Sequence, residues 1–115
     1  VFYDDILITN RNYLKNNEKT VKKFVSSSIK GWEKAIKEHN RAIEITTKYI
    51  NNKKTNIDLQ KKMLEQSIPL IKPTENTKIG TMNESQWQKQ IDLLKEASLI
   101  NNIDPKNVFT NKFLE

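Results

Sequence analysis

Residues 1–10 read VFYDDILITN, and this stretch decides how the rest of the chain is interpreted. Ile6, Leu7 and Ile8 are bulky or β-branched, and polar residues bound them on both sides, which is the pattern of a β-strand. Because adjacent positions are apolar, both faces of the strand are predicted to be covered, as in a parallel sheet. A strand cannot satisfy its main chain alone. The strand predicted at residues 4–9 therefore needs partner strands.

The sequence after residue 16 predicts helices, because apolar residues recur there at steps of three and four. Asn56 (or Thr55) is expected to begin one helix, and Pro69 to end or kink it. Asn83 and Gln86 form a variant of the capping box, and Asp104 precedes a proline at a first helical position. The predicted helical segments are residues 16–40, 40–50, 55–69 and 82–100.

Three residues are predicted to serve packing in these helices. Trp32 and Trp87 each fall on an apolar stripe, so both are expected to be mostly buried. Gly31 is unfavourable inside a helix by about 1 kcal/mol relative to alanine, and its presence predicts a close approach of another backbone.

Asn16 or Asn17 is expected to cap the first long helix.

The charge of the chain does not indicate a nucleic-acid partner. Its net charge is +6, from 20 basic and 14 acidic residues. Nearly all the basic residues are lysines, and they alternate with glutamates at helical spacing, as on a solvated helix face. Only Arg11 and Arg41 offer the forked donor that favours phosphate and guanine.

No group of residues predicts catalysis, a metal or a cofactor. The chain has no cysteine, which excludes disulfides and thiolate ligands. His39 is the only histidine, and it falls at a polar helix boundary, where a capping or solvated role is expected. The two glycines do not form a phosphate-binding loop. The sequence therefore predicts a protein that is not an enzyme.

The aromatic and acidic residues before the predicted strand are the candidate binding residues. In α/β proteins ligands bind at strand ends, where aromatic rings supply apolar walls and a carboxylate orients a polar solute. On this hypothesis Tyr3 and Asp5 bind a ligand. The residues alone support equally the alternative that the aromatic side chains merely pack and that Asp4 and Asp5 end an edge strand.

Several stretches together resemble a known family. The stretch from Tyr3 to Tyr49, which contains Gly31-Trp32, is similar to the C-terminal portion of solute-binding proteins of the thiamine-precursor (NMT1/THI5-like) and alkanesulfonate–nitrate–taurine type. Asn40 stands where that family has a proline. Two further motifs carry the resemblance across nearly the whole chain. They are G-x-M-(D/N)-x-x-x-W, at Gly80, Met82, Asn83 and Trp87, and Y/F-T-N-x-F-L, at Phe109 to Leu114.

The resemblance implies a parent protein with a type II periplasmic-binding-protein fold, in which solute binds between two α/β lobes. Residues 1–115 would be its C-terminal segment, mainly α, with residues 1–10 a strand crossing to the first lobe and residues 11–115 helical. The resemblance implies an extracytoplasmic protein, periplasmic or lipid-anchored, that delivers solute to an ABC transporter permease. It also places Tyr3 and Asp5 near the cleft between lobes. Two acids and two aromatic residues there favour a pyrimidine of the thiamine-precursor type over a sulfonate.

Two alternative functions remain open at this point. The chain could belong to the extracellular solute-sensing domain of a histidine kinase or related receptor, or it could be a free-standing helical interaction protein. As an isolated fragment of the parent protein, the chain would expose an unpaired strand and apolar helix faces, which predicts a dimer, a higher oligomer or a marginally stable monomer.

Overall fold

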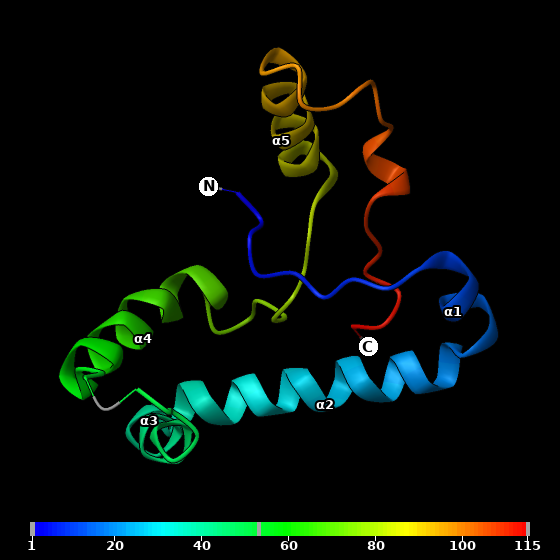
Figure 1. Cartoon of the computed structure of the whole chain (residues 1–115). Coiled ribbons are helices and arrows are strands. Elements are labelled where there is room, and N and C mark those ends of the chain that lie inside the picture. The colour runs from blue at the N-terminus through cyan, green and yellow to red at the C-terminus, as the bar shows by residue number, and fades with distance from the viewer. Residues whose placement is uncertain (1, 53, 115) are drawn as a thin grey trace. The chain divides into compact units, whose positions relative to one another are not determined.

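The computed structural model describes residues 2–52 and 54–114, and these residues are mainly helical (Figure 1). Contacts divide the chain into two compact units. The first unit comprises Val1–Lys23 and Thr81–Glu115, and the second comprises Phe24–Gly80. The helices, in chain order, are α1 (Arg11–Asn16), α2 (Glu18–Lys37), α3 (His39–Thr47), α4 (Ile57–Ile71), α5 (Glu84–Glu96) and the short 3-10 helix η1 (Pro105–Asn107).

The strand predicted at residues 4–9 is not formed. Within residues 2–52 and 54–114 no residue is assigned to a strand, and the chain has a bend at Asp5 followed by an irregular extended stretch up to Asn10. The main-chain N–H of Ile6 donates to the carbonyl of Asp4 (3.1 Å), which is a tight turn. A strand needs a second strand to bond with, and the described chain supplies none. The mainly helical part of the fold prediction is confirmed, and the strand is wrong here.

Side-chain caps begin α4, α5 and η1 where the sequence predicted them. Asn56, Asn83 and Asp104 accept hydrogen bonds through their side chains from main-chain N–H groups in the turns that follow. The Asn17 side chain, in contrast, donates to the carbonyl of Tyr13 (3.1 Å) and does not cap α2. Asn10 caps α1, a short helix that the apolar pattern did not separate from the strand and the following helix.

Pro69 lies inside α4, which continues to Ile71. Of the two predicted outcomes, an end or a kink at this proline, the end is therefore wrong. Proline at this position removes one main-chain donor, and only the last two residues of the helix follow it, so the loss is confined to the final turn. The N–H of Lys72 still bonds to the carbonyl of Ile68 (2.9 Å) and closes the helix.

The second unit consists of most of α2, then α3, α4 and the connector that follows. Helix α3 packs against α4 (Figure 1), and Ile79 in the connector is the buried apolar residue of this unit, at 7% exposure. Nε2 of His39, at the start of α3, lies 3.6 Å from Oε1 of Glu65 on α4. Gly80, which closes the unit, has φ of 84°, a left-handed conformation that favours glycine.

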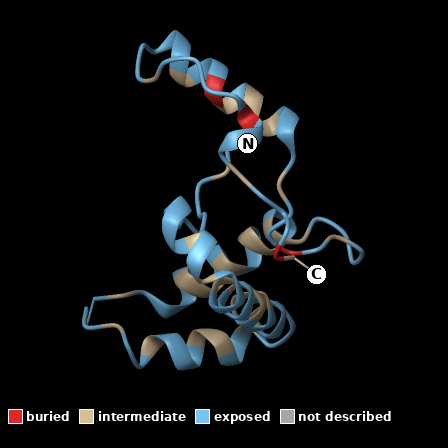
Figure 2. Cartoon of the chain, turned by 90° about the vertical axis from the view of Figure 1, so that its right-hand side faces the viewer, coloured by how far each residue is buried: buried red, intermediate tan, exposed pale blue. Residues whose placement is uncertain are grey.

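Two packing predictions for α2 are wrong. The side chain of Trp32 is 44% exposed, and a Cβ placed on Gly31 would meet no atom within 4 Å. Among the described residues, therefore, no backbone approaches Gly31. The helix has the amphipathic pattern of a buried element but no buried residue (Figure 2). A periodic stripe predicts which face would be covered, and it does not supply the covering element.

The first unit consists of the N-terminal segment, α1, the start of α2, α5, η1 and the C-terminal stretch. Its buried residues are Ile91 on α5, Pro105 in η1 and Phe113 near the C-terminus. Helix α5 packs against η1. Arg11 donates to the carbonyl of Asn107 (3.1 Å), which joins the start of α1 to η1. None of the helices, over the described residues, is long and apolar enough to cross a membrane.

Candidate functional site

Tyr3 is anchored to α5 through its main chain. Its N–H donates to Oε1 of Gln90 (3.0 Å), and its carbonyl accepts from Nε2 of the same side chain (2.9 Å). One glutamine thus satisfies both main-chain groups of a residue 87 positions away. Because an amide side chain carries both a donor and an acceptor, it can bind an extended backbone as a neighbouring strand would. This pair of bonds fixes where the N-terminal segment meets α5.

The Tyr3 side chain takes part in the same anchor. Its ring lies 5.5 Å from the Trp87 ring at 43°, and its hydroxyl accepts a hydrogen bond from the N–H of Asn83 (2.9 Å). Asn83 in turn caps α5 through its side chain. Tyr3 is half-buried by these contacts. Its ring therefore has a packing role in this chain, as one of the two interpretations of the sequence proposed.

Asp5 and Asp4 differ from Tyr3, because both are exposed. Neither carboxylate has a hydrogen bond or an ion pair among the described residues. The bend at Asp5 also removes the regular alternation of a strand, in which consecutive side chains point to opposite faces. Asp5 is thus two residues from the anchored Tyr3 in the sequence, but the structure does not bring the two side chains together in one pocket.

The two C-terminal sequence motifs meet in the first unit. The Asn111 side chain accepts from the N–H of Met82 (3.1 Å) and donates to its carbonyl (2.7 Å). The rings of Trp87 and Phe109 stack at 17° with centroids 6.2 Å apart. Tyr3, Trp87 and Phe109 therefore form one continuous group of rings, which we call the aromatic cluster. The prediction that Trp87 is mostly buried is confirmed.

The indole N–H of Trp87 is buried without a hydrogen-bond partner among the described residues. A buried donor without a partner costs about 1–3 kcal/mol. The ring contacts on both sides of the indole, with Tyr3 and Phe109, must offset that cost. The contacts of Trp87 among the described residues therefore come from its ring and not from its indole N–H.

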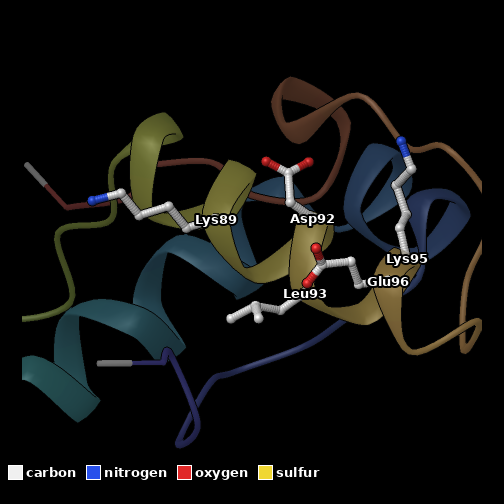
Figure 3. Close-up of a pocket in the computed structure, with 5 residues that line it drawn as sticks. All are labelled: Lys89, Asp92, Leu93, Lys95 and Glu96. Carbon is white, nitrogen blue, oxygen red and sulfur yellow. The ribbon is translucent and has the colours of Figure 1, made fainter.

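A surface hollow lies elsewhere, along α5 (Figure 3). It is lined by Lys89, Asp92, Leu93, Lys95 and Glu96, all exposed. The side chains diverge in Figure 3 and do not converge on a common point. Both signs of charge are present and every lining residue comes from one helix. This hollow is the solvated face of α5, and it includes neither Tyr3 nor Asp5.

A second hollow lies between α1 and the C-terminal stretch. Lys112 forms an ion pair with Glu18 at 2.8 Å, and its ammonium also lies 5.8 Å from the Phe113 ring centroid. Both partners of the ion pair are more than half exposed. Such a pair contributes little to stability. Of the basic groups that line this hollow, Arg11 and Lys112 are occupied by contacts within the unit.

The polar anchors of the unit could not be found from the sequence. Gln90 and Asn111 are ordinary polar residues on patterns that predict exposed positions. Their partners are main-chain atoms of residues that lie 87 and 29 positions away. Periodicity reports which side chains face a core, and it carries no information about an amide side chain that binds a distant backbone.

Comparison with known proteins supports the family resemblance over part of the chain. The family model described as NMT1/THI5 like matches residues 1–42, which are fewer than half of the 115 residues. The match covers Tyr3, Asp5, α1 and α2, and does not reach α4 or α5. No curated protein and no solved structure matches the chain. The match fits a class of extracytoplasmic solute-binding proteins at the family level.

Proposed function

We propose that this chain forms the C-terminal part of an extracytoplasmic solute-binding subunit of an ABC importer. The observation that carries the proposal is the NMT1/THI5-like match over residues 1–42, which includes the candidate residues Tyr3 and Asp5. Under this proposal the rest of the binding protein supplies the opposite wall of the cleft, and the permease is the protein partner. The proposed solute is a pyrimidine of the thiamine-precursor type.

The exposed carboxylate of Asp5 is the proposed ligand acceptor. It has no partner among the described residues, so it can accept hydrogen bonds from an amino group of a heterocycle. A hydrogen bond that involves a charged group contributes about 1.5–3 kcal/mol. Replacing the carboxylate by an amide in Asp5→Asn is therefore expected to weaken solute binding by roughly tenfold or more.

Tyr3 is proposed to form one aromatic wall of the site while its contacts to α5 hold it in place. The residue is half-buried and its ring contacts Trp87, so part of Tyr3 stays accessible. Tyr3→Ala removes the wall, whereas Tyr3→Phe keeps the ring and removes only the oxygen that binds the Asn83 N–H. We expect Tyr3→Phe to retain most of the affinity and Tyr3→Ala to lose it.

The test is isothermal titration calorimetry of the full-length protein that contains this chain. The solutes are a thiamine-precursor pyrimidine, a flavin, taurine and nitrate. Asp4→Asn is the matched control for Asp5→Asn, because it makes the same charge change one residue away. Near-ultraviolet circular dichroism of each variant establishes that the protein is folded before titration. The isolated 115-residue chain is expected to bind none of these solutes tightly.

The outcomes separate the parts of the proposal. Binding of taurine or nitrate without binding of either heterocycle contradicts the solute class and leaves the solute-binding role intact. Wild-type affinity of both Asp5→Asn and Tyr3→Ala contradicts the site. A full-length gene that continues from this segment into a membrane-spanning helix and a kinase would favour the sensor alternative over the importer subunit.

A further inference from the structure

One side of α5 and its cap is occupied by a single residue of the N-terminal segment, Tyr3. Asn83, Trp87 and Gln90 follow one another at steps of four and three, so they lie along the same side of the helix. The main-chain N–H of Asn83 binds the Tyr3 hydroxyl, and the Trp87 ring lies against the Tyr3 ring. The Gln90 amide binds the Tyr3 main chain. The position of Tyr3 is therefore set by α5.

Gln90 supplies the contact that fixes the main chain of this residue. The other two contacts hold the Tyr3 side chain, but rotation about its side-chain bonds still lets the backbone change direction. The two bonds to Gln90 hold the N–H and the carbonyl of Tyr3 at once, and both are partly buried, so water competes for them weakly. A backbone without such bonds samples many conformations. Gln90 therefore sets the direction in which the chain runs from Tyr3 toward Asp5.

A tight turn directly after Tyr3 carries this direction to Asp5. The carbonyl of Asp4 accepts from the N–H of Ile6 (3.1 Å), which makes Asp5 the central residue of the turn. Asp4 is the one residue between the anchored Tyr3 and the turn centre, and its carbonyl is held by the turn itself. The placement of the exposed Asp5 carboxylate thus depends on the main chain that Gln90 holds.

We propose that Gln90 is a positioning residue of the solute site, which holds Tyr3 and Asp5 in the arrangement that binds solute without touching the solute itself. This inference rests on the proposed function. When the segment is not anchored, only the fraction of molecules already in the binding arrangement can take up solute, and the measured affinity falls by that fraction. Gln90 lies outside the matched residues 1–42, so the candidate site and the residue that positions it come from separate parts of the chain.

Gln90→Met in the full-length protein tests this role, because methionine keeps the length of the side chain and lacks the amide. Calorimetry uses whichever solute the wild-type protein binds among the thiamine-precursor pyrimidine, the flavin, taurine and nitrate, and we expect its Kd to rise roughly tenfold. Asn111→Ala is the matched control. It removes an equivalent pair of bonds, to the main chain of Met82, in the same unit and does not contact Tyr3. It should lower stability in urea similarly and leave Kd unchanged.

Hydrogen exchange of the Tyr3 amide gives a second readout, which needs no variant. This N–H exchanges when its bond to Gln90 opens, so its rate reports how often the anchor is released. Coupling between two equilibria is reciprocal, so an anchor that strengthens solute binding is itself strengthened by bound solute. Saturating solute should therefore slow this exchange by about the factor that separates the Kd of Gln90→Met from that of the wild type. An anchor that only stabilises the fold would leave the rate unchanged.

The outcomes separate this inference from the proposed function. Wild-type affinity in Gln90→Met, with weakened binding in Asp5→Asn and Tyr3→Ala, overturns the positioning role and leaves the proposed function standing. Equal loss of affinity in Asn111→Ala and Gln90→Met also overturns it, because the loss would then follow the stability of the unit. So does a Tyr3 amide whose exchange in the wild-type protein does not respond to saturating solute. If the wild-type protein binds none of the four solutes, or if Asp5→Asn and Tyr3→Ala both keep wild-type affinity, the proposed function or its site fails and the positioning role fails with it.

Discussion

The contacts inside the first unit differ in kind from the contacts inside the second unit. In the first unit, side chains bind main-chain atoms far away in the sequence, as Gln90 binds Tyr3 and Asn111 binds Met82. In the second unit, consecutive helices α3 and α4 pack together, and the contact between them, His39 Nε2 with Glu65 Oε1, is partly exposed. Both units have similarly periodic helices. The difference shows that the helical pattern predicts the local structure of both units equally well. It does not reveal which tertiary contacts hold each unit together.

The largest expected difference between the units comes from their tryptophans. Trp87→Ala removes the central ring of the aromatic cluster, and a truncation of this size costs about 2–4 kcal/mol at a mostly buried position. Trp32→Ala, on the exposed face of α2, should cost less than about 1 kcal/mol. Hydrogen exchange measured by NMR, residue by residue, should show lost protection in α5 for the first variant and little change for the second.

Trp87→Phe sharpens that test. It keeps an aromatic ring between Tyr3 and Phe109 and removes the indole N–H that lacks a partner among the described residues. We expect it to be much less destabilising than Trp87→Ala in the same exchange experiment. Equal loss of protection in the two variants would mean that the donor, and not the ring, stabilises the unit.

Asn111→Ala is expected to have the next largest effect. It leaves both main-chain groups of Met82 without their partner, and loss of two hydrogen bonds at a largely exposed site costs about 1–2 kcal/mol. Asn101→Ala, an exposed asparagine of the same unit, is the control and should be neutral. Urea titration followed by the fluorescence of Trp87, in a Trp32→Phe background, measures both. A neutral Asn111→Ala would contradict the view that side-chain-to-backbone contacts close the first unit.

Gln90→Ala tests the anchor of the N-terminal segment and should act more locally. The amide of Tyr3 loses its acceptor, so its exchange should accelerate by about tenfold, which corresponds to roughly 1.4 kcal/mol. Gln88→Ala, on the same helix, removes only an exposed bond to Asp92 and should leave that amide unchanged. Unchanged exchange of the Tyr3 amide in Gln90→Ala would show that the ring contacts alone hold the segment.

The smallest effect is expected in the second unit. Glu65→Gln removes the charge that faces His39 across α3 and α4, with both side chains more than a third exposed. Even when His39 is protonated, a contact so open to solvent contributes no more than about 0.5 kcal/mol, and less in high salt. Urea titration in low and high salt measures the difference. A loss comparable to that of Asn111→Ala would show that the units do not differ as described.

The helices were predictable from the sequence because their signals are local. Caps at Asn56, Asn83 and Asp104 act within a turn of their own position, so their residue types alone indicate where a helix begins. The helix continues past Pro69, where an end was one of the two predicted outcomes, because a proline's cost depends on how many turns follow it. The candidate residues Tyr3 and Asp5 rest on a local pattern and a family resemblance, and their role toward a solute remains a prediction.

What the sequence determined by itself is the longer helices, α2 to α5, and the apolar faces they present. What only the tertiary structure decided is which of those faces is covered and what the chain before α1 becomes. Ile6, Leu7 and Ile8 have the residue types of a strand, yet a strand requires hydrogen-bonding partners along its edge, and the described chain provides none. Tyr3 finds such partners in the Gln90 side chain. The physical reason is that main-chain hydrogen bonds and burial are satisfied by residues distant in sequence, which no local pattern specifies.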